Sequence, residues 1–207
     1  MSRSISLLLL AFWLVSSPLY ADPALRLSAH LQALESLQGR FTQELLDARG
    51  QRLQQSQGRF QLQQPAQIYW ETEQPYPELL ISNGRDLWLY DPDLLQATHQ
   101  RVDAQLDATP VSLLLNPDQS LTQTYHIQLR EEAGREIYRL RPLDETQGLL
   151  EEIRLTFFQG ELVGLGLEDS LGQITSISLR EVERNQEIDP QVFEWTPPAG
   201  VDVIQEG

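Results

Sequence analysis

The chain has 207 residues and a formal net charge of −15, with 15 basic residues, all of them arginine, against 30 aspartates and glutamates. An acidic chain without basic clusters is a poor partner for nucleic acid or anionic lipid, because both require neutralising cations. Cysteine is absent, which excludes a disulfide scaffold, a cysteine nucleophile, a thiolate metal site and acylation of this chain at a cysteine. With 41% hydrophobic residues, the composition is that of a globular domain with a sizeable core.

The first 21 residues have the pattern of an export signal. Arg3 precedes an apolar stretch from Ile5 to Val15, and Ala21 supplies the small residue before a cleavage site. As a helix this stretch would rise only about 16 Å, which is too short for the roughly 30 Å hydrocarbon core of a membrane. The alternatives are an uncleaved anchor or a buried N-terminal helix. We expect a signal peptide over residues 1–21 and a single exported domain over residues 22–207.

One helix is expected at the start of the mature domain. Asp22 can cap this helix, and Pro23 suits its first position. Leucines then follow at helical spacing, at Leu27, Leu31, Leu34 and Leu37. We expect the helix to stop at Gly39.

Beyond Phe41 the hydrophobic pattern has a period of two, which is typical of strands. In the first half the alternating runs lie at residues 60–62, 68–70, 79–81, 87–89 and 96–98, with a tight turn at Asn83-Gly84. In the second half they lie at residues 125–129, 138–140, 153–157, 163–167 and 177–179, and Phe193 with Trp195 forms a last short strand. No long helix separates consecutive strands, so the sheet must be largely antiparallel. We predict a mainly β domain of about eleven strands with a few helices.

A sheet of this width must curl, and the question is what fills its concave side. A short helix is expected from Pro110 to Leu115, between the cap Thr109 and the stop Asn116-Pro117, and it carries more apolar surface than a solvent-facing helix would. A closed barrel filled by its own side chains is one possibility. A half-open barrel with an apolar cavity under a helical lid is the other.

Catalytic and metal-binding patterns are missing from the sequence. His30, His99 and His126 are widely spaced and have no neighbouring carboxylate at ligand spacing. Asp91 and Asp93 flank a proline and are interpreted as a turn rather than a cation site. There is no nucleophile elbow and no phosphate-binding glycine loop. We therefore expect neither an enzyme nor a metal site.

Short motifs run along the chain in a fixed order. They are Phe41-Thr42-Gln43, Gln57-Gly58, Pro65 through Trp70, Gln74-Pro75, Ser82-Asn83-Gly84, Leu87 through Pro92, Gln96-Ala97-Thr98, Thr109-Pro110, Asp169 with Gly172-Gln173, and Phe193, Pro197-Pro198 and Gly200-Val201. In this order and spacing, behind a signal peptide and without a lipidation cysteine, the chain resembles the LolA family of periplasmic outer-membrane lipoprotein carriers. The resemblance covers essentially all of the expected mature chain.

The resemblance implies an antiparallel, unclosed (half-open) β-barrel with a helical lid over an apolar cavity. It also implies a periplasmic, monomeric chaperone without a cofactor, which receives acylated lipoproteins from the inner-membrane ABC complex LolCDE and hands them to the outer-membrane receptor LolB. Such a carrier is physically necessary, because exposing each buried CH₂ group to water costs about 0.8 kcal/mol. The alternative is a periplasmic lipid-binding sensor or regulatory module of the same fold, which does not transport lipoproteins.

The alternation and the resemblance together give the expected site. The acyl-binding cavity is expected to be lined by Phe60, Leu62, Ile68, Trp70, Leu79, Ile81, Leu87, Leu89, Leu155, Phe157 and Leu165. The lid is expected to carry Leu31, Leu34, Val111, Leu113 and Leu114. Much of the family has an arginine before the proline of the Pro65 segment, where it latches the lid through backbone carbonyls. This chain has Gln64 there, and a neutral amide should hold the lid more weakly.

Overall fold

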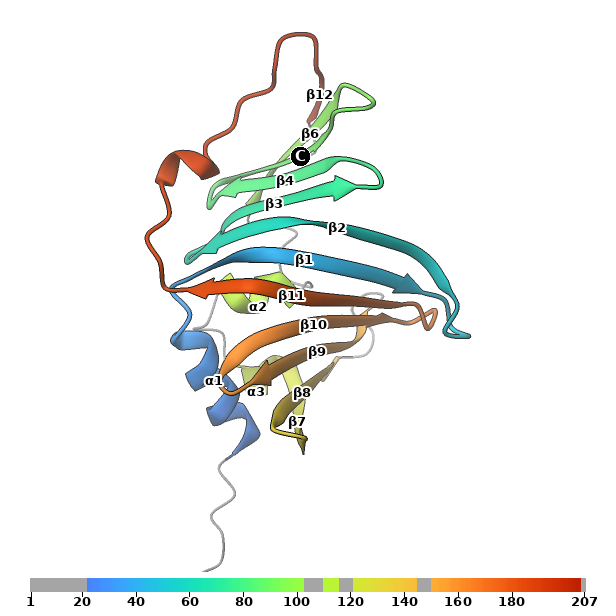
Figure 1. Cartoon of the computed structure of the whole chain (residues 1–207), viewed down its shortest axis with the longest axis vertical. Coiled ribbons are helices and arrows are strands. Elements are labelled where there is room, and N and C mark those ends of the chain that lie inside the picture. Colours follow the sequence, from blue (N-terminus) through green and yellow to red (C-terminus); the bar gives the residue numbers. More distant parts are fainter. Residues whose placement is uncertain (1–21, 103–109, 116–120, 145–149, 206–207) are drawn as a thin grey trace, which may run out of the picture.

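The computed structural model describes residues 22–102, 110–115, 121–144 and 150–205. The expected signal peptide, the cap Thr109 and the stop Asn116-Pro117 lie outside these residues. Within them, no helix is both long enough and apolar enough to cross a membrane. The strands form one sheet of 12 strands in the order β12-β6-β5-β4-β3-β2-β1-β11-β10-β9-β8-β7. The sheet curls, and α1, α2 and α3 lie against one of its faces (Figure 1).

The sheet is built from long strands in the middle and short ones at one edge. The strands are β1 (Ser36–Leu46), β2 (Arg52–Gln63), β3 (Gln67–Gln74), β4 (Glu78–Asn83), β5 (Asp86–Asp91), β6 (Gln96–Arg101), β7 (Tyr125–Glu132), β8 (Arg135–Pro142), β9 (Leu150–Phe158), β10 (Glu161–Asp169), β11 (Ile174–Arg184) and β12 (Asp202–Gln205). The helices are α1 (Pro23–Gln32), α2 (Pro110–Leu115), α3 (Leu121–Thr124) and the short 3₁₀ helix η3 (Pro190–Phe193).

Helix α1 is shorter than the sequence predicts. Its start is as expected, because the Asp22 carboxylate accepts a hydrogen bond from Ala24 N at 2.9 Å. The helix ends at Gln32, and both Leu37 and Gly39 belong to β1. The prediction that Gly39 stops the helix is therefore wrong. A Cβ at Gly39 would lie 2.8 Å from the Arg180 carbonyl oxygen, so this glycine allows β11 to approach β1 closely.

The sheet is antiparallel except at one edge, where β12 runs parallel to β6. In the described residues, β12 and β7 are the two edges and do not pair with each other, so the barrel is unclosed. The expected last strand at Phe193 and Trp195 is not present. Asp189 and Pro190 instead begin η3, with the Asp189 carboxylate accepting from Gln191 N. The C-terminal segment passes outside the sheet before it reaches β12 (Figure 1).

The main hydrophobic core lies between the concave face of the sheet and the helices. One cluster joins buried leucines of α1 and α2 to inward-facing residues of β1, β2, β3, β8, β9, β10 and β11. A second group packs on the convex face, where the Trp195 ring lies 5.3 Å from that of Trp88 and 5.2 Å from that of Tyr90. The C-terminal segment therefore covers part of the outer surface, and the helices fill the inner one.

Candidate functional site

The concave face begins with paired aromatic and aliphatic residues of β2 and β3. Phe60 lies opposite Trp70, and Leu62 lies opposite Ile68. Because residues paired across antiparallel strands project from the same face, these four side chains point into one space. Trp70 stacks on Phe41 of β1, with 4.3 Å between ring centroids, and on Phe60 at 5.5 Å. Phe60, Leu62 and Ile68 are buried, and Trp70 is half-buried against them.

The other half of the same face comes from β9 and β10. Leu155 lies opposite Leu165, and Phe157 lies opposite Leu162. All four residues are buried and belong to the same cluster as Phe60. The curl of the sheet thus brings two groups of residues, far apart in sequence, to the two sides of one apolar interior.

Two residues assigned to the cavity from sequence lie on the wrong face. Leu79 and Ile81 pair with Tyr90 and Trp88 on the convex side, under the C-terminal segment. The residue of β4 that pairs with Trp70, and so faces inward, is Leu80. The β3–β4 connection sets this register, and a shift of one residue reverses every side chain of the strand. Alternation within β4 could not show which of its residues face inward, because leucine or isoleucine occupies positions 79, 80 and 81 in succession.

Leu87 and Leu89 of β5 do project from the concave side, opposite Ser82 and Leu80. Neither belongs to the central cluster. Leu87 is buried, whereas the Leu89 side chain is exposed. These two residues extend the apolar face toward the edge of the sheet.

The residues predicted to form the lid pack against this face. Leu31 of α1, Leu34 just after it, and Leu113 and Leu114 of α2 are buried in the cluster, and Val111 is half-buried against it. Helix side chains therefore occupy part of the space that sequence reasoning assigned to a cavity. Between Leu62, Leu114 and their neighbours a cavity of only ≈ 10 Å³ remains, about the space of one water molecule.

Gln64 joins the sheet to both lid segments. Its side-chain Nε2 donates to the backbone carbonyl oxygen of Leu114 at 2.9 Å and to that of Leu31 at 3.3 Å. The hydrogen bonds expected for this position are therefore present, and they are neutral. A role of Gln64 in gating the lid stays a prediction.

A polar cluster joins α1 to the start of β8. His30 Nε2 lies 2.8 Å from Glu136 Oε2, and its ring stacks on Phe157 with 4.4 Å between centroids. Tyr138 and Arg26 also donate to the Glu136 carboxylate. Burial alone would raise the pKa of Glu136, but the hydrogen bonds from Tyr138, His30 and Arg26 together hold this pKa below its ordinary value. The pKa of Tyr138 is raised, mainly by burial and to a lesser extent by its hydrogen bond to Glu136.

Sequence reasoning missed several residues of the interior. They are Leu37, Phe41, Leu80, Tyr138, Leu140, Ile153, Leu162 and Leu179, all in or against the cluster. Alternation was visible for Tyr138 and Leu140, but nothing in one strand says which face is concave. Leu37 was assigned to the first helix, because a leucine three residues after Leu34 fits a helix as well as a strand.

Two further polar clusters among the described residues are held by neighbouring side chains. His99 stacks on Trp88 and contacts Asp86 and Gln205. Glu152 is 2% exposed and is held by three arginines on the convex face: Arg139, Arg141 and Arg154. Among the described residues, no group of three or more histidines or carboxylates is arranged to hold a metal ion.

Comparison with known proteins agrees with this architecture. The profile of the family described as outer membrane lipoprotein carrier protein LolA matches residues 32–196. The chain belongs to the LolA family. A LolA relative from Chromohalobacter salexigens, an outer-membrane lipoprotein carrier protein, is 39% identical over 182 residues, which is 88% of this chain and 86% of that protein. One from Azotobacter vinelandii with the same description is 37% identical over 202 residues, 97% of each chain.

A solved structure shows the fold at much lower identity. An uncharacterized conserved protein from Thermus thermophilus superimposes with a TM-score of 0.54 at 11% sequence identity, covering 88% of this chain and 97% of that one. The unclosed antiparallel barrel implied by the LolA resemblance is confirmed by the sheet itself. The described residues form 12 strands where about eleven were predicted. The predicted runs included neither β1 nor β12, and they included a strand at Phe193 and Trp195 that is absent.

Proposed function

We propose that this LolA family chain is a periplasmic carrier of acylated lipoproteins. In this proposal the chain receives its cargo from LolCDE, holds the acyl chains between the concave face and the helices, and passes the cargo to LolB. The single observation that carries the proposal is the way the interior is closed. An apolar face is covered by two short lid segments, and one glutamine side chain joins both of them to the sheet.

The energetics of this closure suit a carrier. Acyl chains entering the interior would replace the lid leucines, so one set of apolar contacts would be exchanged for another. Because the displaced lid leucines would lose their buried contacts, the net gain on loading would be smaller than the full burial energy of the acyl chains. A modest net affinity allows the cargo to be released to a receptor, which a rigid and fully complementary cavity would prevent.

The test is the identity of the bound molecule. The full chain is exported in a bacterial host and purified from the periplasm, and the bound species are identified by mass spectrometry. We expect acylated lipoproteins. The matched control is a cargo lipoprotein in which the acylated cysteine is replaced by serine, and this cargo should not co-purify. Recovery of free lipid alone would overturn the transport proposal and favour the sensor or regulatory module of the same fold.

A further inference from the structure

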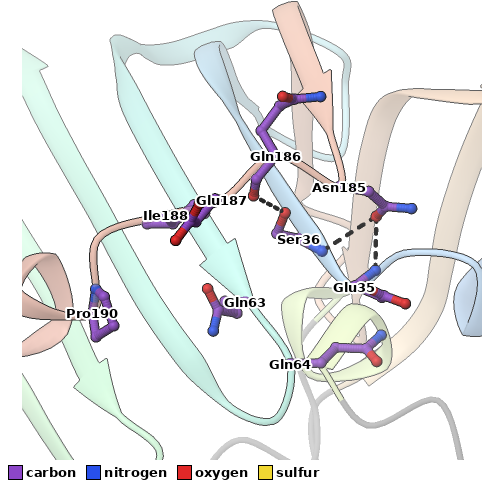
Figure 2. A pocket seen from close by; sticks show the side chains of 9 residues that line it. All are labelled: Glu35, Ser36, Gln63, Gln64, Asn185, Gln186, Glu187, Ile188 and Pro190. Atoms are coloured by element: carbon purple, nitrogen blue, oxygen red, sulfur yellow. Dashed lines mark hydrogen bonds between the residues drawn. The ribbon is translucent and has the colours of Figure 1, made fainter.

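A polar pocket lies beside the closed apolar interior. Its volume is ≈ 630 Å³, within the range of about 300–1,000 Å³ that is usual for ligand sites. It is lined by Glu35, Ser36, Gln63, Gln64, Asn185, Gln186, Glu187, Ile188 and Pro190. Figure 2 shows Gln63 and Gln64, at the end of β2, on one side of the pocket and the segment from Asn185 to Pro190 on the other.

The walls of this pocket are held by hydrogen bonds of their own. Asn185 has a φ of 56°, in the left-handed region that asparagine tolerates better than most residues. Its side-chain oxygen accepts from Glu35 N at 2.9 Å and Ser36 N at 3.4 Å, and its amide nitrogen donates to the Ala33 carbonyl at 2.9 Å. The Ser36 hydroxyl donates to the Gln186 carbonyl at 2.7 Å. The walls of the pocket are therefore held in place by hydrogen bonds within the protein (Figure 2).

Several polar side chains of the pocket have no partner among the described residues of the protein. Glu35 and Glu187 are exposed and Gln63 is half-buried, and in the described part of the chain their side chains have no hydrogen-bond or ion-pair partner within the protein. The lining contains two carboxylates and several amides but no arginine. Such a set repels phosphate and other anions, whereas it suits N–H donors and the alternating N–H and C=O groups of a peptide.

The pocket adjoins the seam where α2 meets the sheet. The small cavity between Leu62, Leu114 and Leu115 shares Glu35, Ser36 and Gln64 with the pocket. Gln64 thus stands at the boundary between a polar and an apolar space, and its amide nitrogen is bonded to the Leu114 carbonyl. A carbonyl group arriving in the pocket would compete for this same donor.

We propose that this pocket binds the first polypeptide residues of the cargo, next to the linkage that carries the acyl chains. This inference rests on the proposed function, because it takes the cargo to be an acylated polypeptide. Backbone N–H groups of the cargo bind the carboxylates of Glu35 and Glu187, and a cargo carbonyl takes the Gln64 amide from Leu114. Binding of the polar part therefore opens the seam through which the acyl chains enter.

Site-specific photocrosslinking tests the position of the cargo. A photoreactive residue replaces Gln63 in the pocket, Gln55 on the same strand outside it, or Ile68 in the apolar interior, and the loaded protein is irradiated and digested. We expect Gln63 to capture peptide next to the acylated residue, Ile68 to capture acyl chain, and Gln55 to capture neither. Capture at Ile68 without capture at Gln63 would overturn this inference while the carrier function stands. Capture at neither position would count against the proposed function itself.

A binding measurement tests the chemistry of the pocket. The probes are a synthetic triacylated peptide of a few residues and labelled palmitate, which has no peptide. We expect Glu187→Gln to weaken binding of the acylated peptide about tenfold, as for loss of a charged hydrogen bond, and to leave palmitate binding unchanged. Glu183→Gln, outside the pocket on β11, is the matched control and should change neither. Equal loss with both probes, or no loss with either, would refute the assignment.

Discussion

Replacing Gln64 should change how tightly the lid is closed in the empty protein. Its amide donates at 2.9 Å to the Leu114 carbonyl and at 3.3 Å to that of Leu31. A neutral hydrogen bond contributes about 0.5–1.5 kcal/mol, and the longer one should lie at the low end. Together they stabilise closure by about 1–2 kcal/mol, which is a factor of about 5–30 in the ratio of closed to open protein.

Two substitutions at this position should act in opposite directions. Gln64→Leu keeps the size of the side chain and removes both hydrogen bonds, so the open population should rise. Gln64→Arg supplies charge-assisted donors, each worth about 1.5–3 kcal/mol, so the closed population should rise. A probe without a peptide, such as labelled palmitate, should accordingly bind more readily to Gln64→Leu and less readily to Gln64→Arg than to the parent chain.

The assay is a distance distribution between two spin labels. The chain has no cysteine, so cysteines introduced at Ser112 in α2 and at Ser178 on β11 can be labelled uniquely. We expect longer, broader distances in Gln64→Leu and a narrower, closed distribution in Gln64→Arg, with cargo shifting each toward the open state. If both variants fold and show the parental distribution, Gln64 does not control the lid and the reasoning is refuted.

Three further predictions follow from the site and its surroundings. A photocrosslinker at Ile68 should capture acyl chains, and one at Ile81 on the convex face should capture none; equal capture would contradict the register. The pKa of Glu136 is lower in the folded state than its unfolded value of about 4.5. Its contribution to stability is therefore complete above the unfolded pKa and is lost as pH falls through the folded pKa. Glu136→Gln should accordingly flatten the acid side of a plot of melting temperature against pH. Glu152→Gln should lower the free energy of unfolding by about 1–3 kcal/mol, because the buried carboxylate loses its charge-assisted hydrogen bonds to three partly exposed arginines. A chemical denaturation curve showing a loss of less than about 0.5 kcal/mol would contradict this.

The order of elements along the chain could be predicted from local signals. Asp22 and Pro23 mark the start of α1, and alternation marks most strands, because capping and the period of two are properties of neighbouring residues. The absence of long helices between strands was enough to predict an antiparallel sheet. The prediction of an unclosed barrel and of a special role for position 64 came from the family resemblance. Alternation of apolar and polar residues indicates neither.

The faces of the strands and the contents of the interior were decided by tertiary structure. Leu79, Leu80 and Ile81 are all apolar, and pairing with β3 places Leu80 inside and the other two outside. Leu37 fits a helix by spacing but lies in β1, where pairing with Leu62 buries it. The sequence by itself determined which residues are apolar and at what local period. Only long-range pairing and the packing of α1 and α2 decided which of them share one space, since that depends on contacts between residues far apart in the chain.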